Sequence, residues 1–557
     1  MLIHGNVNDN LRNGTAGDDT FAMFQGGDDT VSGLGGADTF KFRAAFTASD
    51  RIDGGGDHDK LILKGDYSTG VVFEAATLVD VEEIRIGKGN DYVLTTHDAT
   101  VAAGQTLQVN GFRMQAADAL VFDGSAETDG AFWITSGAGD DRITGGDGAD
   151  VLRPGSGNDS ADGGGGDDAI SVTFFNESDS IVGGDGDDRL VITGNGIDDA
   201  VFMNSDTLDS VETMVLRPGF DGQFIMHDAN VAAGERLNVN GLDAARLVFD
   251  GSSETDGRFV ISGSGGADTL SGGDRKDRFN LAAGGDDNVS GADDDDAFYM
   301  GGQFTGLDAV SGGAGTDTVY MDGLDAADAL SFTATTMTGV DRLVLADADY
   351  FSGFVTDDAT VAAAAMLAVE AGGLTTNALA WNGSAETDGA FSITGGGGAD
   401  QLQGGAGADV LIGNGGGDTL RGHGGGDQLT GGAGADTFQY DAVADSDFPG
   451  FDTITGLNAD EDRFDLTGVS GGSVTEVDLV SVTLGGAASF SNYVDAGCSA
   501  AGNPIAGAVA ITMNGGPAAG HVILFVDASG NGVFDEGDDY LFDITGYTGT
   551  LDIGDFI

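Results

Sequence analysis

Short runs of alternating apolar and polar residues, separated by Gly-rich turns, recur along the 557-residue chain. In the clearest pattern, nine residues long, an aspartate at the sixth position is followed two residues later by an apolar residue. This alternation is typical of β-strands, in which successive side chains point to opposite faces. One apolar side chain per nine residues cannot form a core alone, so the pattern predicts strands stacked into a β-helix. Five copies run in tandem over residues 395–439: GGGGADQLQ, GGAGADVLI, GNGGGDTLR, GHGGGDQLT and GGAGADTFQ.

The nonapeptide can be aligned nineteen times. The copies begin at Gly14, Phe24, Gly33, Gly54, Ser136, Gly145, Pro154, Gly163, Gly183, Gly263, Gly272, Ala282, Gly291, Gly312, Gly395, Gly404, Gly413, Gly422 and Gly431. The apolar eighth position fails once, at Ala161, and GADDDDAFY and GGDRKDRFN lack the glycine at the fourth position. Glycine makes up 99 residues, so loose matches arise by chance, but a fixed phase between aspartate and hydrophobe does not follow from composition.

A longer repeat is superimposed on the nonapeptides. HDATVAAG at 97–104 returns 130 residues later as HDANVAAG at 227–234, and again as DDATVAAA at 357–364. SAETDG at 125–130 returns as SSETDG at 252–257 and SAETDG at 384–389. The segments that lie between the groups of nonapeptides, called the interposed segments below, contain strand-like runs such as LVFDG. Short strands are therefore predicted there too. His97 and His227 are replaced by Asp357 in the third copy, which favours turn or surface roles over catalysis.

Charge narrows the possible partners. The chain has 22 Lys and Arg against 92 Asp and Glu, a net charge of −70, which excludes nucleic acid and argues against anionic membrane surfaces. Such a charge opposes compaction unless bound cations cancel it. With Cys498 as the single cysteine, no intramolecular disulfide can form. No apolar run reaches the length of a membrane span, and MLIHGNVNDN at the start does not have the features of a cleavable secretory signal.

Calcium is the cation that this composition favours, because carboxylates and turn carbonyls are the hard oxygen ligands it prefers. We expect several Ca²⁺ ions, each held by sixth-position carboxylates and by carbonyls of the Gly-rich turns. The predicted ligands are Asp19, Asp29, Asp38, Asp59, Asp141, Asp150, Asp159, Asp168, Asp188, Asp268, Asp277, Asp287, Asp296, Asp317, Asp400, Asp409, Asp418, Asp427 and Asp436.

A further calcium site is predicted in DASGNGVFDEGD, residues 527–538. Its first seven positions match an EF-hand loop, and position twelve is an aspartate in place of the bidentate glutamate, which should weaken the site. A polar hairpin loop without metal is the alternative. The candidate ligands are Asp527, Ser529, Asn531, the Val533 carbonyl and Asp538.

The nonapeptides resemble the RTX (repeats-in-toxin, haemolysin-type calcium-binding) proteins of bacterial type I secretion. Residues 445–469, DSDFPGFDTITGLNADEDRFDLTGV, resemble the segment that follows the repeats in serralysin-type secreted proteins, although Gly456-Leu457 replaces the usual Asp-Phe. The terminal Asp-Phe-Ile, residues 555–557, is similar to the uncleaved C-terminal signal of type I substrates. The resemblance implies two nonapeptides per turn, calcium between turns, the type I secretion machinery as a partner, and a secreted, extracellular or cell-surface location.

Enzyme signatures are poor. The chain has no His-Glu-x-x-His, so a serralysin-like zinc protease is not expected. GVSGG at 468–472 satisfies the Gly-x-Ser-x-Gly esterase pattern but has no α/β context, and in so Gly-rich a chain the match carries little weight. We therefore expect no catalytic domain.

The sequence thus predicts an all-β, elongated parallel β-roll or β-solenoid. Its predicted divisions are an N-terminal roll (1–62), three repeat modules (63–191, 192–320 and 321–394), a five-repeat roll (395–439) and a C-terminal capping and secretion region (440–557). The predicted role is structural, as a surface-layer or adhesive protein, with cell-surface polysaccharide or its own copies as possible partners. The alternatives are an extracellular hydrolase or polysaccharide-modifying enzyme acting in the interposed segments, and a pore-forming toxin, for which no amphipathic helix is found.

Overall fold

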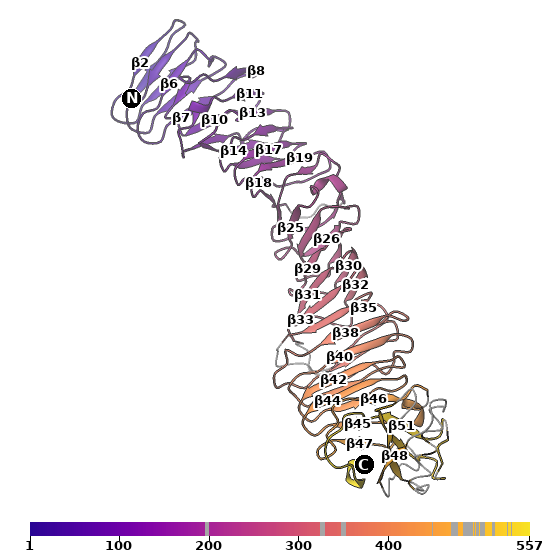
Figure 1. Cartoon of the computed structure of the whole chain (residues 1–557). Coiled ribbons are helices and arrows are strands. Elements are labelled where there is room, and N and C mark those ends of the chain that lie inside the picture. The colour runs from indigo at the N-terminus through magenta and orange to yellow at the C-terminus, as the bar shows by residue number, and fades with distance from the viewer. Residues whose placement is uncertain are drawn as a thin grey trace. The chain divides into compact units, whose positions relative to one another are not determined.

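The structure is a computed structural model of the chain (Figure 1). It describes all residues except 195–199, 324–328, 347–352, 448, 469–476, 483–493, 495, 497–500, 502–506, 515–518, 532 and 536. The chain divides into two compact units, Met1–Phe279 and Asn280–Ile557. Among the described residues, no helix is long and apolar enough to cross a membrane.

Both units are β-solenoids, in which each coil gives one strand to each of two parallel sheets. Two nonapeptides make one coil: Ile143 in β15 (Arg142–Thr144) pairs with Ala161 in β17 (Ser160–Gly165), eighteen residues later. On the other sheet Leu152 pairs with Ile170. The predicted all-β parallel solenoid is therefore confirmed.

In the first unit, one sheet consists of thirteen parallel strands. They are β1 (Leu2–His4), β3 (Thr20–Met23), β5 (Thr39–Phe42), β7 (Lys60–Leu63), β10 (Glu83–Ile86), β12 (Thr106–Asn110), β14 (Ala131–Gly137), β16 (Val151–Gly155), β18 (Ala169–Val172), β20 (Arg189–Ile192), β23 (Thr213–Leu216), β25 (Arg236–Asn240) and β27 (Arg258–Ser262).

The opposite side of the first unit is formed by three successive sets of strands. The sets are β2 (Leu11–Asn13), β4 (Thr30–Ser32), β6 (Arg51–Asp53) and β9 (Leu78–Val79); then β8 (Tyr67–Val72), β11 (Tyr92–Thr95), β13 (Leu120–Asp123), β15, β17, β19 (Ser180–Asp185) and β22 (Leu208–Asp209); then β21 (Val201–Phe202), β24 (Asp221–Ile225), β26 (Arg246–Asp250) and β28 (Thr269–Ser271). The short 3₁₀ helices η1 (Asp98–Thr100) and η2 (Asp228–Asn230) lie between coils, and β29 (Arg278–Asn280) spans the boundary of the units.

The second unit continues with the same kind of coil. One sheet contains β31 (Ala297–Gly301), β33 (Thr318–Met321), β36 (Arg342–Leu345), β38 (Met366–Glu370), β40 (Ala390–Thr394), β42 (Val410–Gly415), β44 (Gln428–Ala433) and β46 (Asp452–Ile454). Facing it are β30 (Asn288–Asp293), β32 (Ala309–Ala314) and β35 (Met337–Thr338), followed by β34 (Leu330–Ser331), β37 (Phe354–Val355), β39 (Ala380–Asn382), β41 (Gln401–Gln403), β43 (Thr419–Arg421), β45 (Thr437–Gln439) and β47 (Arg463–Asp465).

The core is a column of apolar side chains between the two sheets. Leu152, Ile170 and Leu190 on successive coils are 0 or 1% exposed, and Phe21 stacks on Phe40 with ring centroids 4.9 Å apart. Ala161, the one small residue at an eighth position, is also fully buried. The interposed segments form coils of the same solenoid, because β13 pairs with β11 on one side and β15 on the other.

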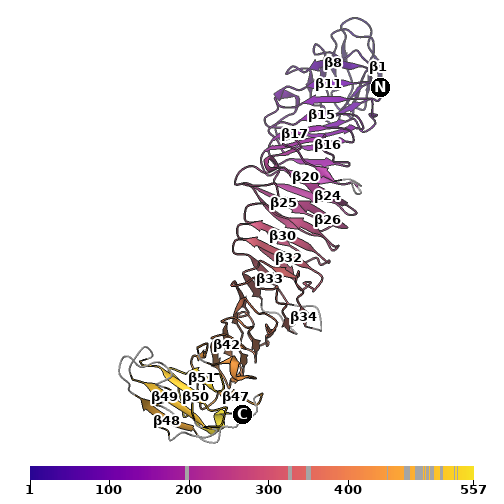
Figure 2. The same cartoon turned by 90° about the vertical axis from the view of Figure 1, so that its right-hand side faces the viewer.

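The C-terminal region ends the second solenoid with a different topology. Strands β48 (Val477–Val482), β49 (Ala508–Met513), β50 (Val522–Val526) and β51 (Tyr540–Asp543) lie side by side (Figure 2). Strand β50 runs antiparallel to β49 on one side and to β51 on the other, and β51 pairs in parallel with β46. Two further 3₁₀ helices are η3 (Val443–Asp445) and η4 (Ile553–Asp555), and Phe556 stacks on Phe464 of β47 at 5.5 Å.

Truncating one core side chain tests the stacked core. We expect Leu411→Ala to lower the free energy of unfolding of the calcium-loaded chain by about 2–5 kcal/mol, because Leu411 is fully buried between coils and leaves a cavity. Gln428→Ala, on an exposed position of the next coil, is the control and should change it by less than about 0.5 kcal/mol. Guanidinium unfolding followed by circular dichroism measures both, and equal effects would contradict the stacked core.

Candidate calcium sites

The sixth-position aspartates form hydrogen-bonded ladders that run from coil to coil. The backbone N–H of Asp400 donates to Oδ1 of Asp418 at 2.8 Å, and the N–H of Asp418 donates in the same way to Asp436 at 2.8 Å. The N–H of Asp150 likewise donates to Asp168 at 2.6 Å. Because the side chain of one coil accepts from the backbone of the preceding one, each aspartate fixes the stacking of its neighbour.

The second carboxylate oxygen of eight ladder aspartates is buried without a hydrogen-bond partner. Their side chains are 0–2% exposed. The eight are Asp38, Asp59, Asp168, Asp188, Asp317, Asp418, Asp427 and Asp436. A buried carboxylate oxygen with no partner is costly, since water is lost and nothing replaces it. In the described part of the chain, these atoms are the strongest indication of sites that would bind a cation.

Backbone carbonyl oxygens of the next coil lie close to these partnerless carboxylate oxygens. A Cβ added to Gly413 would lie closer than 3.0 Å to both Asp418 Oδ2 and the carbonyl oxygen of Gly431 on the next coil. The equivalent space at Gly163 is bounded by Asp168 Oδ2 and a carbonyl of the following coil. Glycine at the first position therefore leaves room where a carboxylate and a carbonyl of adjacent coils face each other. Ca²⁺ takes six to eight such oxygens, so the donor set fits calcium.

Turn geometry explains the glycine at the fourth position. Gly416 and Gly434 have φ values of +125° and +140°, which residues with a Cβ rarely adopt. In the copy that has Asp294 instead of glycine, the aspartate itself takes φ +68°. Aspartate tolerates this region better than most residues, so the turn is retained at some cost in strain.

Burial shifts the titration of the ladder. Desolvation, followed by repulsion from Asp150 and Asp188, raises the pKa of Asp168 to about 7. Burial raises the pKa of Asp418 to about 6, with the neighbouring ladder aspartates adding to the shift. Without a cation, ionising these carboxylates thus opposes folding at neutral pH.

Fourteen of the nineteen predicted sixth-position ligands fall into two groups. In six of them, both carboxylate oxygens accept backbone hydrogen bonds; for example, Asp409 accepts from Phe391 at 2.6 Å and from Gly405 at 2.7 Å. The six are Asp141, Asp150, Asp268, Asp277, Asp400 and Asp409. They lie on the first nonapeptide coil after an interposed segment. Six of the eight with a partnerless oxygen lie on later coils, and the other two, Asp38 and Asp59, lie in the N-terminal roll.

The ladders also include acidic residues that the nonapeptide pattern missed. Asp179 accepts from the N–H of Asp159 at 2.8 Å, and Asp308 accepts from Asp287 at 2.8 Å. Others at equivalent positions are Asp50, Asp452, Asp462, Glu82, Glu212 and Asp341. All are followed two residues later by an apolar residue, as in Asp179-Ser-Ile181. The spacing of acid and hydrophobe, without glycines, is the signal that could have found them.

The EF-hand-like loop is arranged differently from the predicted ligand set. Asp538 is exposed, whereas Asp539 is fully buried and accepts from the N–H of Ser529 at 3.0 Å and of Asp535 at 2.8 Å. Burial raises the pKa of Asp539 to about 6, and Asp527 and Asp535 contribute by repulsion. Asp539 is therefore the carboxylate that faces the interior of the loop.

His97, His227 and Asp357 occupy the same position in the three copies of the longer repeat, and their side chains accept the same backbone hydrogen bond. Nδ1 of His97 accepts from the N–H of Ala99 at 3.0 Å, and His227 does the same with Ala229 at 3.1 Å. In the third copy, Oδ1 of Asp357 accepts from the N–H of its second neighbour at 3.0 Å. Both residue types cap a turn, as predicted. Residues 469–472 of the esterase-like pattern lie outside the described residues.

Acidity should stabilise the metal-free chain. Because folding raises the pKa of Asp168 from 3.8 to about 7, the folded state binds more protons than the unfolded state between these values. In chelator, stability should therefore fall as the pH rises from about 4 to about 7. Saturating calcium should largely remove this dependence.

The measurement is thermal unfolding by circular dichroism at several pH values, in chelator and in calcium. Asp168→Asn should make the chelator profile less steep, because one of several titrating aspartates is lost. Metal-free stability that rises with pH over this range would contradict the assignment.

Comparison with known protein families agrees with this geometry. Residues 308–497 match the family described as Peptidase M10 serralysin C terminal. Four segments, residues 25–41, 133–161, 175–191 and 260–286, match the RTX calcium-binding nonapeptide repeat. No curated protein matches the chain. As its sequence predicts, the chain carries RTX calcium-binding nonapeptide repeats together with a serralysin C-terminal region.

Proposed function

We propose that this is a secreted calcium-binding RTX protein whose coils fold when they bind extracellular Ca²⁺, and that its role is structural, as a surface-layer or adhesive protein. The observation that carries the proposal is the set of eight buried carboxylate oxygens without a hydrogen-bond partner, which recur on stacked coils. Each of these oxygens lies at the same position in its coil and would be stabilised by a bound cation.

Because calcium binds the folded state far better than the unfolded state, its concentration controls how much of the chain is folded. Ca²⁺ binds the folded turns, whose oxygens come from two adjacent coils, and hardly binds the open chain. At a tenfold excess over its dissociation constant, one site stabilises the folded state by about 1.4 kcal/mol, and the contributions of several sites add. Without calcium, a net charge of −70 opposes compaction.

The last residues support an order of events for export. Phe556 stacks on Phe464, and the N–H of Ile557 donates to the Phe464 carbonyl at 2.9 Å. This segment, which resembles a type I secretion signal, is thus packed against the last coil of the folded chain. In a cytoplasm low in calcium the coils and this segment would be open to the secretion machinery; outside, calcium would fold both.

The catalytic alternative has less support. An active site in the interposed coils would be built from segments that share the same short motifs in three copies. Motifs repeated three times suit binding or assembly better than a single catalytic centre.

Calcium titration of the full chain tests the proposal. From chelator to about 10 mM Ca²⁺, we expect a cooperative gain of β-structure by circular dichroism and compaction by sedimentation velocity. Asp418→Asn with Asp436→Asn should raise the calcium midpoint, because two ligand carboxylates are lost. The exposed pair Asp209→Asn with Asp243→Asn removes the same charge elsewhere and should leave the midpoint unchanged. If the wild-type chain is as folded in chelator as it is in calcium, the proposal is wrong.

A further inference from the structure

The two motifs of the longer repeat touch each other across adjacent coils. Oδ1 of Asp228, from HDANVAAG, accepts from both the N–H and the Oγ1 of Thr255, from SSETDG, at 2.9 and 2.7 Å. The same bridge joins Asp98 to Thr128 and Asp358 to Thr387. The motifs recur together because each supplies half of one contact.

A buried glutamate lies at the centre of this contact. Glu254 is 0% exposed, and its Oε1 accepts from the N–H of Gly257 at 2.8 Å and of Asp256 at 3.2 Å. Its Oε2 is buried and has no hydrogen-bond partner. In the first copy the equivalent oxygen of Glu127 accepts from the N–H of Val101 at 3.2 Å. The second copy therefore has a carboxylate oxygen that the fold does not satisfy.

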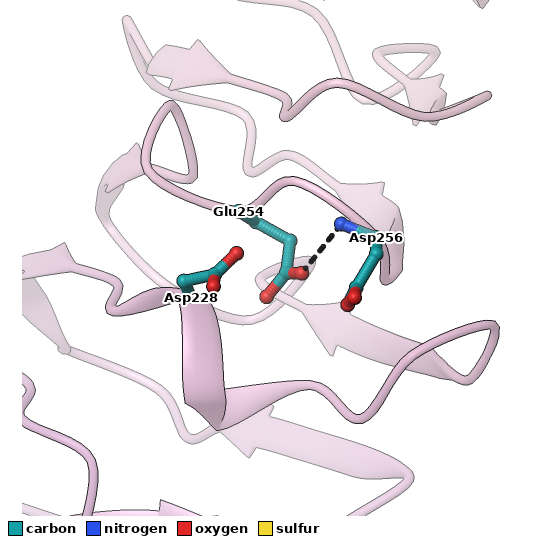
Figure 3. A group of neighbouring side chains, drawn as sticks. All are labelled: Asp228, Glu254 and Asp256. Atoms are coloured by element: carbon teal, nitrogen blue, oxygen red, sulfur yellow. Dashed lines mark hydrogen bonds between the residues drawn. The ribbon is translucent and has the colours of Figure 1, made fainter.

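Two more carboxylates lie beside that of Glu254. One ligand atom from each of Asp228, Glu254 and Asp256 lies within 4.8 Å of the others, and the carboxylate of Glu254 lies between the two aspartates (Figure 3). The aspartates are exposed, so an ion can reach the site from solvent.

We propose that Asp228, Glu254 and Asp256 bind a calcium ion outside the nonapeptide repeats. Three carboxylates present only hard oxygens, which favour Ca²⁺ over metals that prefer nitrogen or sulfur. The exposed side leaves room for water ligands. Such an ion would tie η2 to the loop between β26 and β27, and so would stabilise the interposed coils as the nonapeptide ions stabilise theirs.

Native mass spectrometry of the full chain counts the bound ions. At a free calcium concentration that saturates the wild type, Asp256→Asn should hold one ion fewer, because one ligand is lost at an exposed position. Asp243→Asn, also exposed in this module, should hold the wild-type number. Equal non-zero counts for Asp256→Asn and wild type would overturn the site while leaving the nonapeptide sites intact. A wild type that binds no calcium would instead defeat the proposed function.

A second variant tests whether the buried carboxylate of Glu254 is stabilised by a bound ion or by a proton of its own. If Glu254 were simply neutral, the amide of Glu254→Gln would replace it and the ion count would stay the same, which would contradict the proposal. If Glu254 is a ligand, Glu254→Gln loses one ion. Circular dichroism in calcium confirms that the variant is folded.

An independent observation concerns positive charge. Four of the 22 Lys and Arg residues, namely Lys64, Arg85, Lys88 and Arg113, line one cavity of about 450 Å³. It lies over the paired strands β7, β10 and β12, and no acidic side chain lines it. Arg85 pairs with Glu83, but Lys64 and Lys88 have no ion pair among the described residues.

An aromatic ring lies beside these cations. Phe112 is 60% exposed, and the Arg113 guanidinium lies 5.3 Å from its ring centroid. We infer that this cavity binds a carboxylated saccharide. The lysines and arginines attract the carboxylates, the exposed ring packs against the apolar face of a sugar, and the volume is that of a small-ligand site. Four cationic side chains would repel a calcium ion, so this cavity is not another calcium site.

Calorimetry with trigalacturonate, in calcium, tests this assignment. Lys64→Gln with Lys88→Gln should weaken binding at least tenfold, whereas Lys41→Gln with Arg51→Gln, which removes the same charge from nearby coils, should not. Maltotriose, a neutral trisaccharide, should not bind. Equal affinity in both double variants, or binding of inorganic phosphate without binding of trigalacturonate, would overturn the saccharide assignment.

Discussion

The rest of the structure depends on a carboxylate that joins two coils. One oxygen of each ladder aspartate accepts a backbone N–H from the preceding coil, as between Asp400 and Asp418 at 2.8 Å. The other faces a carbonyl of the next coil across a space that only glycine leaves open. The same side chain therefore sets the spacing of the coils and creates the demand for a cation. In the proposed function, stability and calcium binding are therefore coupled, because without an ion the stacking group would be buried and charged.

The interposed segments extend this architecture without its glycines. Asp179 and Asp308 continue the ladders, and each precedes a buried apolar residue at the same spacing as in the nonapeptides. Acid-x-hydrophobe is thus the minimal unit of a coil, and the Gly-rich turn is an addition that opens space for an ion. The longer repeat adds its own contact between coils, the Asp228–Thr255 bridge, beside which Glu254 lies buried.

Charge is distributed to match these roles. The ladder carboxylates lie where adjacent coils meet, whereas the cavity beside Phe112 is lined by four cations and by no acidic side chain. In the proposed function, charge repulsion holds the chain open, an external ion folds it, and the cations of the cavity remain available for an acidic ligand. The motifs that occur three times support the proposed role in binding or assembly.

The all-β solenoid and the preference for calcium can be predicted from the sequence alone, because the phase of aspartate and hydrophobe is local and repeats, whereas two nonapeptides per coil was implied by the resemblance to RTX proteins. Which carboxylate oxygens are left without a partner depends on the tertiary structure. Asp409 and Asp418 stand in nearly identical nonapeptides, yet Asp409 has both oxygens bonded to amides and Asp418 has one free. The preceding coil bonds one oxygen of each; the difference is the N–H of Gly405, in the turn of Asp409 itself, which bonds the second oxygen of Asp409, whereas that of Asp418 has no partner. Likewise, that Asp539 and not Asp538 turns inward, and that HDANVAAG meets SSETDG, follows from chain paths that no local pattern encodes.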